Sequence, residues 1–155
     1  MKTRLACMLY ESMLVLGLVF GAGLLFSVVM QQRHALFLRG GMQAWLFFIM
    51  AMYFVWFWSH GRQTLPMKTW YIRLVDRFGQ PVGYGRALLR YLLCWLWVLP
   101  GLILVYLLGT KHWMSVLIPA ANMALWALTI YLDPQRQFLH DRIAGTRLVR
   151  VAAPT

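Results

Sequence analysis

Acidic residues are scarce in this sequence, and charged residues of either sign are few. The 155-residue chain has four carboxylates against fifteen Lys and Arg residues, which gives a net charge of +11 with only 12% charged residues. Soluble domains carry about a quarter charged residues, so this shortage, together with 61% apolar residues, indicates lipid as the solvent. The carboxylates are Glu11, Asp76, Asp133 and Asp141.

Catalytic and metal-binding patterns are also lacking. The two cysteines, Cys7 and Cys94, have no metal-ligand spacing, and we interpret both as small apolar packing residues. His140, Asp141 and Arg142 are adjacent, but no serine or cysteine nucleophile accompanies them and no second histidine lies at ligand spacing. This favours a salt-bridge network over an acid/base site. We therefore expect no enzyme activity, no catalytic residue, no metal and no cofactor.

The basic residues form short clusters between long neutral stretches, which is typical of membrane proteins. No nucleic-acid-binding module is visible, so we expect anionic lipid headgroups as partners and not nucleic acid. The sequence leaves open a homo-oligomer or a membrane-protein partner.

Four long apolar runs predict transmembrane helices. Each run offers about 20 residues, enough to cross roughly 30 Å of hydrocarbon at 1.5 Å per residue. The last two are separated only by Lys111 and His112, and two spans with a tight turn fit the lengths better than one kinked hairpin. We expect a single domain over residues 1–155, with spans at about 10–32, 41–59, 91–110 and 113–132, a loop at 60–90 and a tail at 133–155.

The distribution of Lys and Arg predicts the orientation of these spans. Twelve of the fifteen lie in the N-terminus, the middle loop and the tail, and the other three are Arg33, Arg39 and Lys111. Since cytoplasmic segments are enriched in Lys and Arg, we expect a bacterial inner-membrane protein with both termini and the middle loop in the cytoplasm.

Two features within the spans concern helix packing. Gly17, Gly21 and Ser27 form a stripe of small residues with Gly23 beside them, which permits close approach of another helix. That helix belongs either to the same monomer, which we favour, or to a second copy. Pro100 and Pro119 fall inside spans and predict kinks.

The segments outside the spans also show patterns. The segments 70–75 and 146–151 are rich in β-formers and share Arg-Leu-Val, so we predict that they pair as a small sheet. A turn containing Gly79 is expected at 76–81. Residues 134–144 are expected to form a short interfacial helix capped by Asp133, with Phe138, Leu139 and Ile143 toward lipid. The predicted fold class is thus an all-α membrane protein with four transmembrane helices, a small cytoplasmic two-stranded β element and a short interfacial C-terminal helix.

Glu11 is the most informative charged residue because it lies just inside the first apolar run. A carboxylate there is costly, and Arg4 lies two helical turns earlier on the same face. Glu11 is therefore either a proton or cation site, with Arg4 and Asp133 or Asp141 nearby, or one member of an ion pair that fixes helix packing. For Asp133, capping is the favoured role. The expected headgroup-binding residues are Lys68, Arg73, Arg86, Arg90 and Arg142.

One set of residues and segments carries a family pattern: Arg4, Ala6 and Glu11, and the segments 63–68, 72–76, 85–90 and 139–146. Together they resemble the RDD family of membrane proteins. That family is named for one arginine and two aspartates: Arg4 fits the arginine, Glu11 replaces the first aspartate, and Asp141 or Asp133 fits the second. Pro66 stands where the family pattern has glycine. The resemblance implies a multi-pass membrane fold, with either cation/proton exchange, suggested for some members, or an accessory role.

Two functions from different classes follow as hypotheses. The first, which we favour, is a non-enzymatic accessory or scaffold protein whose basic cytoplasmic surface binds lipids or a partner. The second is a small proton-coupled cation transporter that uses Glu11. Four spans with a single acid at the membrane edge offer few polar groups for a transport path in a monomer, which favours the first hypothesis.

Overall fold

The computed structural model describes residues 2–31, 38–132 and 137–151, with the main chain alone for residues 2–5 and 132. Within this part, four helical segments are long and apolar enough to cross a membrane. All four overlap the predicted spans, which confirms four apolar helices of spanning length. Their bounds are Ala6–Val29, Arg39–Trp58, Tyr84–Leu108 and Met114–Tyr131.

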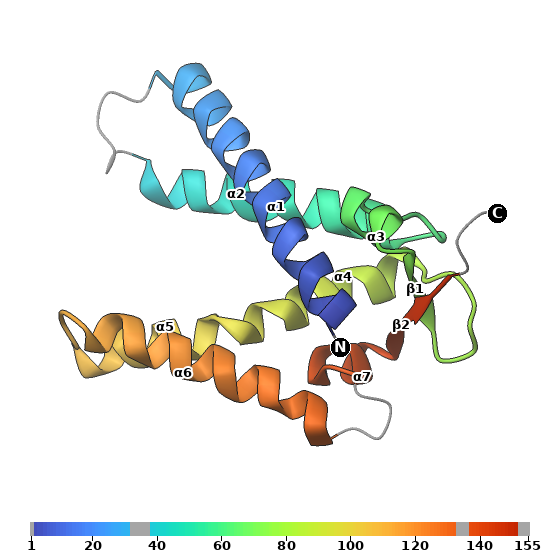
Figure 1. The fold of residues 1–155 in the computed structure, drawn as a ribbon. Coiled ribbons are helices and arrows are strands. Elements are labelled where there is room, and N and C mark those ends of the chain that lie inside the picture. Colours follow the sequence, from blue (N-terminus) through green and yellow to red (C-terminus); the bar gives the residue numbers. More distant parts are fainter. Residues whose placement is uncertain (1, 32–37, 133–136, 152–155) are drawn as a thin grey trace.

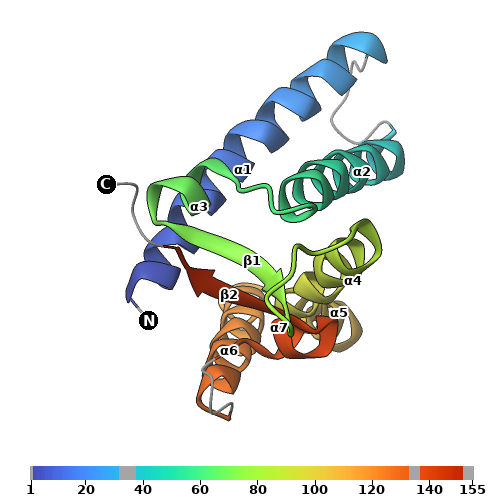
Figure 2. The same ribbon diagram turned by 90° about the vertical axis from the view of Figure 1, so that its right-hand side faces the viewer.

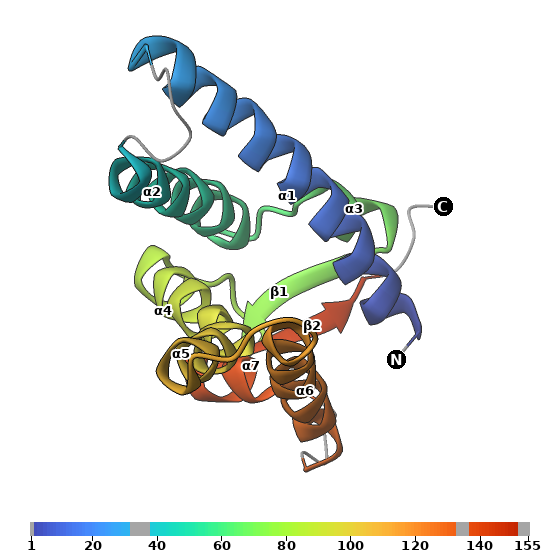
Figure 3. The same ribbon diagram turned by 90° about the vertical axis from the view of Figure 1, so that its left-hand side faces the viewer.

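The helices form two pairs that extend from a common end of the molecule (Figure 1). Helix α1 (Lys2–Val29) packs against α2 (Arg39–Trp58), and α5 (Leu99–Leu108) packs against α6 (Met114–Leu128). Helix α4 (Tyr84–Cys94) connects the pairs, because it contacts α2 and leads into α5. Figure 2 shows the small sheet beside α4 and α7, and Figure 3 shows α1 well separated from α6. We call the end that carries the sheet the sheet end.

The third span is interrupted, as its proline predicts. Helix α4 ends at Cys94, a 3₁₀ turn covers Trp95–Trp97, and α5 restarts with Pro100 in its first turn. Proline is tolerated there because the first helical N–H groups have no partner within the helix. A Cβ on Gly101 would lie 2.8 Å from Cα of Pro119 in α6. Glycine is therefore what allows α5 and α6 to approach at this level.

The sheet end contains the short elements. Strand β1 (Ile72–Asp76) pairs antiparallel with β2 (Thr146–Arg150), with Leu74 opposite Leu148, which confirms the predicted pairing. Helix α3 (Leu65–Thr69) precedes β1, and Thr64 caps it by accepting the N–H of Met67 at 3.4 Å. Helix α7 (Leu139–Ala144) precedes β2. The buried apolar cluster lies here: Cys7, Trp58, Met67, Ile72, Leu74, Val82, Ala87 and Tyr91.

Two expectations about packing are wrong. A Cβ on Gly17, Gly21 or Gly23 would meet nothing within 4 Å among the described residues, so this part of the small-residue stripe packs against no helix of the monomer. Phe138 does not face lipid: it is 4% exposed and its ring lies 5.4 Å from that of Trp97.

The position of Phe138 has a structural reason. It precedes α7 in extended backbone, so its ring does not share the helical face of Ile143, which is exposed as predicted. The predicted capping residue Asp133 and residues 134–136 lie outside the described residues. The observed helix begins at Leu139.

Candidate functional site

A buried ion pair joins the third span to the C-terminal helix. Arg90 lies in α4, and its Nε donates to Oδ1 of Asp141 in the first turn of α7 at 2.6 Å. The residues are 5% and 0% exposed. Arg90 was expected to reach lipid headgroups, and that expectation is wrong because its side chain is enclosed and paired. The partner of Asp141 is therefore in the third span, whereas the sequence left open whether Asp141 or Asp133 lies beside the first helix.

Neighbouring groups hold the pair in place. The guanidinium carbon of Arg90 lies 4.0 Å above the ring of Trp58, a cation–π contact. The hydroxyl of Thr146 donates to the carboxylate and the main-chain carbonyl of Asp141, at 3.4 Å each. Within the described residues, Nη1 of Arg90 and Oδ2 of Asp141 have no hydrogen-bond partner. Both atoms are enclosed, so the pair keeps a donor and an acceptor that no described residue satisfies.

His140 contacts the same pair as a neutral side chain. Its Nδ1 accepts the indole N–H of Trp97 at 3.2 Å, and its Nε2 lies 3.6 Å from Oδ1 of Asp141. Burial lowers the pKa of His140 to about 4, with the nearby carboxylate opposing the shift. Because Nδ1 accepts, the proton of the neutral ring sits on Nε2, facing Asp141. Arg142 is exposed, so the charged partner of Asp141 is Arg90 and not its sequence neighbour.

Glu11 joins α1 to α2 and to the start of α3. Its Oε2 accepts the hydroxyl of Thr64 at 2.6 Å, and its Oε1 accepts the hydroxyl of Tyr53 at 3.2 Å. The proposed partners Arg4 and Asp133 lie outside the described side chains. Among the described ones, the contacts of Glu11 are hydrogen bonds from neutral donors. These contacts agree with the prediction that Glu11 fixes helix packing. The observed partners are Tyr53 and Thr64, where the sequence analysis expected an ion pair.

Asp76 organises the turn after β1. Its Oδ1 accepts the backbone N–H groups of Phe78 and Gln80 at 2.8 and 2.9 Å, and its Oδ2 accepts Nη1 of Arg86 at 3.0 Å. The N–H of Gln80, followed by those of Phe78 and Arg86, holds the pKa of Asp76 below its usual value. The Arg86 side chain is 52% exposed, so this pair lies at the surface.

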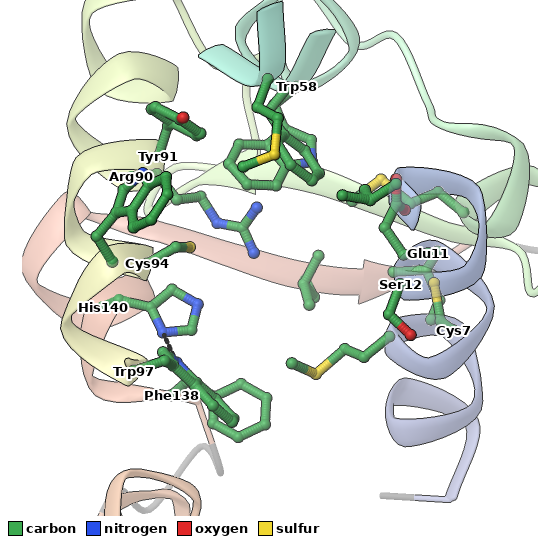
Figure 4. A pocket seen from close by; sticks show the side chains of 18 of the residues that line it. Cys7, Glu11, Ser12, Trp58, Arg90, Tyr91, Cys94, Trp97, Phe138 and His140 are labelled. Atoms are coloured by element: carbon green, nitrogen blue, oxygen red, sulfur yellow. Dashed lines mark hydrogen bonds between the residues drawn. The ribbon is translucent and has the colours of Figure 1, made fainter. Parts of the chain in front are cut away.

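A cavity of about 420 Å³ separates α1 from α4. Figure 4 shows Glu11 on the α1 side and Arg90 on the α4 side, with the guanidinium projecting into the space. Both cysteines and His140 also line it, and most other lining residues are apolar or aromatic. The cavity thus brings together Glu11 and Arg90, which are 79 positions apart in the chain.

The other predicted headgroup-binding residues lie at the surface of the sheet end. Lys68 in α3, Arg73 in β1 and Arg142 in α7 are exposed. No group of three or more His, Cys, Asp or Glu residues in the described part of the chain is arranged to hold a metal ion.

Comparison with known proteins agrees with the resemblance noted from the motifs. The model of the RDD family matches residues 1–145 of the chain. No curated protein and no solved structure matches this sequence. The matched region covers all four spans, the Arg90–Asp141 pair and Glu11. The chain is a multi-pass membrane protein that belongs to the RDD family.

Proposed function

We propose that this chain is a non-enzymatic accessory protein of the bacterial inner membrane, whose sheet end lies in the cytoplasm and binds anionic lipid headgroups. The start of α1, the segment between α2 and α4, and β2 all gather at the sheet end, as expected for an even number of crossings (Figure 1). Most Lys and Arg residues lie in the same segments, which supports the cytoplasmic placement.

The observation that carries the proposal is the contrast between one buried, paired arginine and several exposed basic side chains. Arg90 is inside and paired with Asp141, whereas Lys68, Arg73 and Arg142 remain exposed. Internal contacts thus fold the sheet end and leave a basic outer surface free for headgroups. Such a surface gains about 1 kcal/mol per Lys or Arg near an anionic membrane.

Headgroup binding is tested with the triple variant Lys68→Gln/Arg73→Gln/Arg142→Gln. Purified protein is reconstituted in nanodiscs of phosphatidylcholine with and without phosphatidylglycerol, and the gain in melting temperature from the anionic lipid is measured. We expect the triple variant to lose most of this gain and the single variant Lys111→Gln, at the opposite end, to keep it. An unchanged gain in the triple variant would contradict the proposal.

A second candidate is cation/proton exchange at Glu11. The observation that favours it is the position of Glu11, in the first span and on the wall of the cavity. In proteoliposomes with an imposed Na⁺ or K⁺ gradient and an internal pH dye, we expect no proton flux above that of protein-free vesicles. Cation-driven flux that disappears in Glu11→Gln while the protein stays folded would instead establish the exchanger and refute the accessory role.

A further inference from the structure

The cavity between α1 and α4 has charged groups of opposite sign on its two walls. Glu11 lies on one wall and Arg90 on the other (Figure 4). Apolar and aromatic side chains provide most of the remaining lining, among them Phe54, Trp58 and Phe138. A volume of about 420 Å³ falls within the range of sites that hold small ligands.

Arg90 brings a positive charge to the α4 wall. The side chain is 6% exposed, its Nε is bonded to Asp141, and its Nη1 is enclosed without a partner among the described residues. The guanidinium projects into the cavity (Figure 4), so a ligand oxygen placed there would meet a charged group.

Glu11 retains acceptor capacity on the facing wall. Each of its oxygens accepts one hydrogen bond, from Tyr53 or from Thr64. A carboxylate has about four lone-pair sites, so roughly half remain for a donor from a ligand. An ammonium group with N–H donors is the natural complement to such a site.

The charges around the cavity discriminate among ligands. Glu11 is the one carboxylate among the residues that line the cavity, and Arg90 is the one arginine. A purely anionic headgroup would approach Glu11, and a purely cationic one would approach Arg90. A zwitterion that places its negative group at Arg90 and its positive group at Glu11 satisfies both walls.

The cavity also reaches the lipid-facing surface. Val15 extends the lining one helical turn beyond Glu11, and Val98 extends it two turns beyond Arg90. Met8 and Ser12 line the cavity from the first span and are themselves exposed. Acyl chains can therefore continue from the cavity into the bilayer.

We propose that this cavity binds one zwitterionic aminophospholipid, with its phosphate at Arg90, its ammonium at Glu11 and its chains directed past Val15 and Val98 into the membrane. This site is separate from the basic outer surface of the proposed function and stands without it. The amine N–H donors should make phosphatidylethanolamine a better ligand than phosphatidylcholine, whose quaternary nitrogen has none.

Native mass spectrometry of the purified full chain tests the proposal. The protein is equilibrated with equal amounts of phosphatidylethanolamine, phosphatidylglycerol and phosphatidylcholine with identical chains, and the retained lipid is identified. We expect one phosphatidylethanolamine per chain, preferred about tenfold, a difference of 1.4 kcal/mol. Equal retention of the three lipids would overturn the proposal.

Two variants locate the site. Met8→Trp fills the cavity at its α1 wall, whereas Met13→Trp makes the same change at an exposed position of α1 that does not line it. We expect Met8→Trp to lose about 90% of the retained lipid and Met13→Trp to lose none. Equal retention by the two variants would place the lipid elsewhere and refute the site.

Glu11→Gln separates ligand recognition from a purely structural role. Removing the carboxylate should shift the preference from phosphatidylethanolamine toward phosphatidylglycerol, because the negative charge that disfavours an anion is gone. A variant that keeps the wild-type headgroup preference would show that Glu11 does not bind the ammonium group.

Discussion

The two ends of the molecule are held together by different kinds of contact. At the sheet end, Arg90 pairs with Asp141, Glu11 accepts two hydroxyl groups, and β1 pairs with β2. Away from the sheet end, α5 and α6 meet closely at Gly101, and the indole of Trp45 donates to the carbonyl of Ala22 in α1. Most of the remaining surface of α1 there is exposed.

The difference follows from the membrane as a solvent. Between spans, lipid chains are as apolar as the side chains they replace, so burying leucine against leucine gains little. Helices are then held by close packing at small residues or by polar groups. In this protein the polar contacts are concentrated at the sheet end, and the largest mutational effects are expected there.

The largest effect is expected when Arg90 is replaced. Arg90→Gln leaves the carboxylate of Asp141 buried without its partner, which typically costs about 3–5 kcal/mol. Arg86→Gln, one turn earlier on the same helix, breaks the pair with Asp76, in which Arg86 is half exposed, and should cost much less because solvent screens this pair. The two variants are compared by their melting temperatures in detergent, which are measured by fluorescence-detected size-exclusion chromatography after heating. Similar losses would show that burial does not set the strength of these pairs.

Acid should destabilise the sheet end through His140. The pKa of its buried ring is about 4, below the usual 6.5, so the unfolded chain takes up a proton first as the pH falls. Stability from the neutral ring is therefore present above pH 6.5 and is lost between 6.5 and 4, by at most about 3 kcal/mol. The melting temperature of the wild type should therefore fall as the pH is lowered across this range, and that of His140→Gln should change much less. An equally small change in the wild type would contradict the buried neutral histidine.

Away from the sheet end, glycine positions should divide into two classes. Gly101→Ala places a methyl group against the backbone of Pro119, and overpacking of this kind costs about 1–3 kcal/mol. Gly17→Ala meets no atom within 4 Å and should be neutral or stabilising by up to about 1 kcal/mol through helix propensity. Thermal melts of the two variants check this. A loss in Gly17→Ala equal to that in Gly101→Ala would imply a partner helix on the α1 stripe.

A smaller loss is expected at Thr64. Thr64→Val removes the 2.6 Å hydrogen bond to Glu11 and the cap on α3, together about 1–2 kcal/mol. The control is Thr69→Val, whose hydroxyl bonds only the carbonyl of Leu65 in the same short helix and whose loss should stay within about 0.5 kcal/mol. Unfolding of both variants is followed by tryptophan fluorescence. An equal loss of stability in the control would show that the contact with Glu11 does not stabilise the protein.

Local patterns in the sequence were sufficient for the spans, the strand pair and the break before Pro100. Charge-free length, β-former enrichment and a missing N–H act within a few residues and do not depend on the rest of the fold. Thr64 followed by Leu65 and Pro66 also has a local capping signature. The sequence therefore contained a signal for the position of Thr64 at a helix start, although not for its contact with Glu11.

The partners of the charged residues depended on long-range folding. Nothing near Arg90 distinguishes it from Arg86, four residues earlier, yet one is enclosed and the other half exposed. The difference arises because α7 brings Asp141, 51 positions away, to Arg90, whereas Arg86 meets Asp76 at the surface. Tyr53 gave no signal either, since a tyrosine inside an apolar run is ordinary membrane composition.

The central claim is that the Arg90–Asp141 pair holds the third span to the C-terminal helix, and a double-mutant cycle tests it most directly. Arg90→Met, Asp141→Leu and the double variant are compared with the wild type by chemical unfolding in the same detergent. The account predicts that each single variant is less stable than the double variant, with a coupling of at least about 2 kcal/mol. Additive losses, with a coupling below about 0.5 kcal/mol, would contradict it.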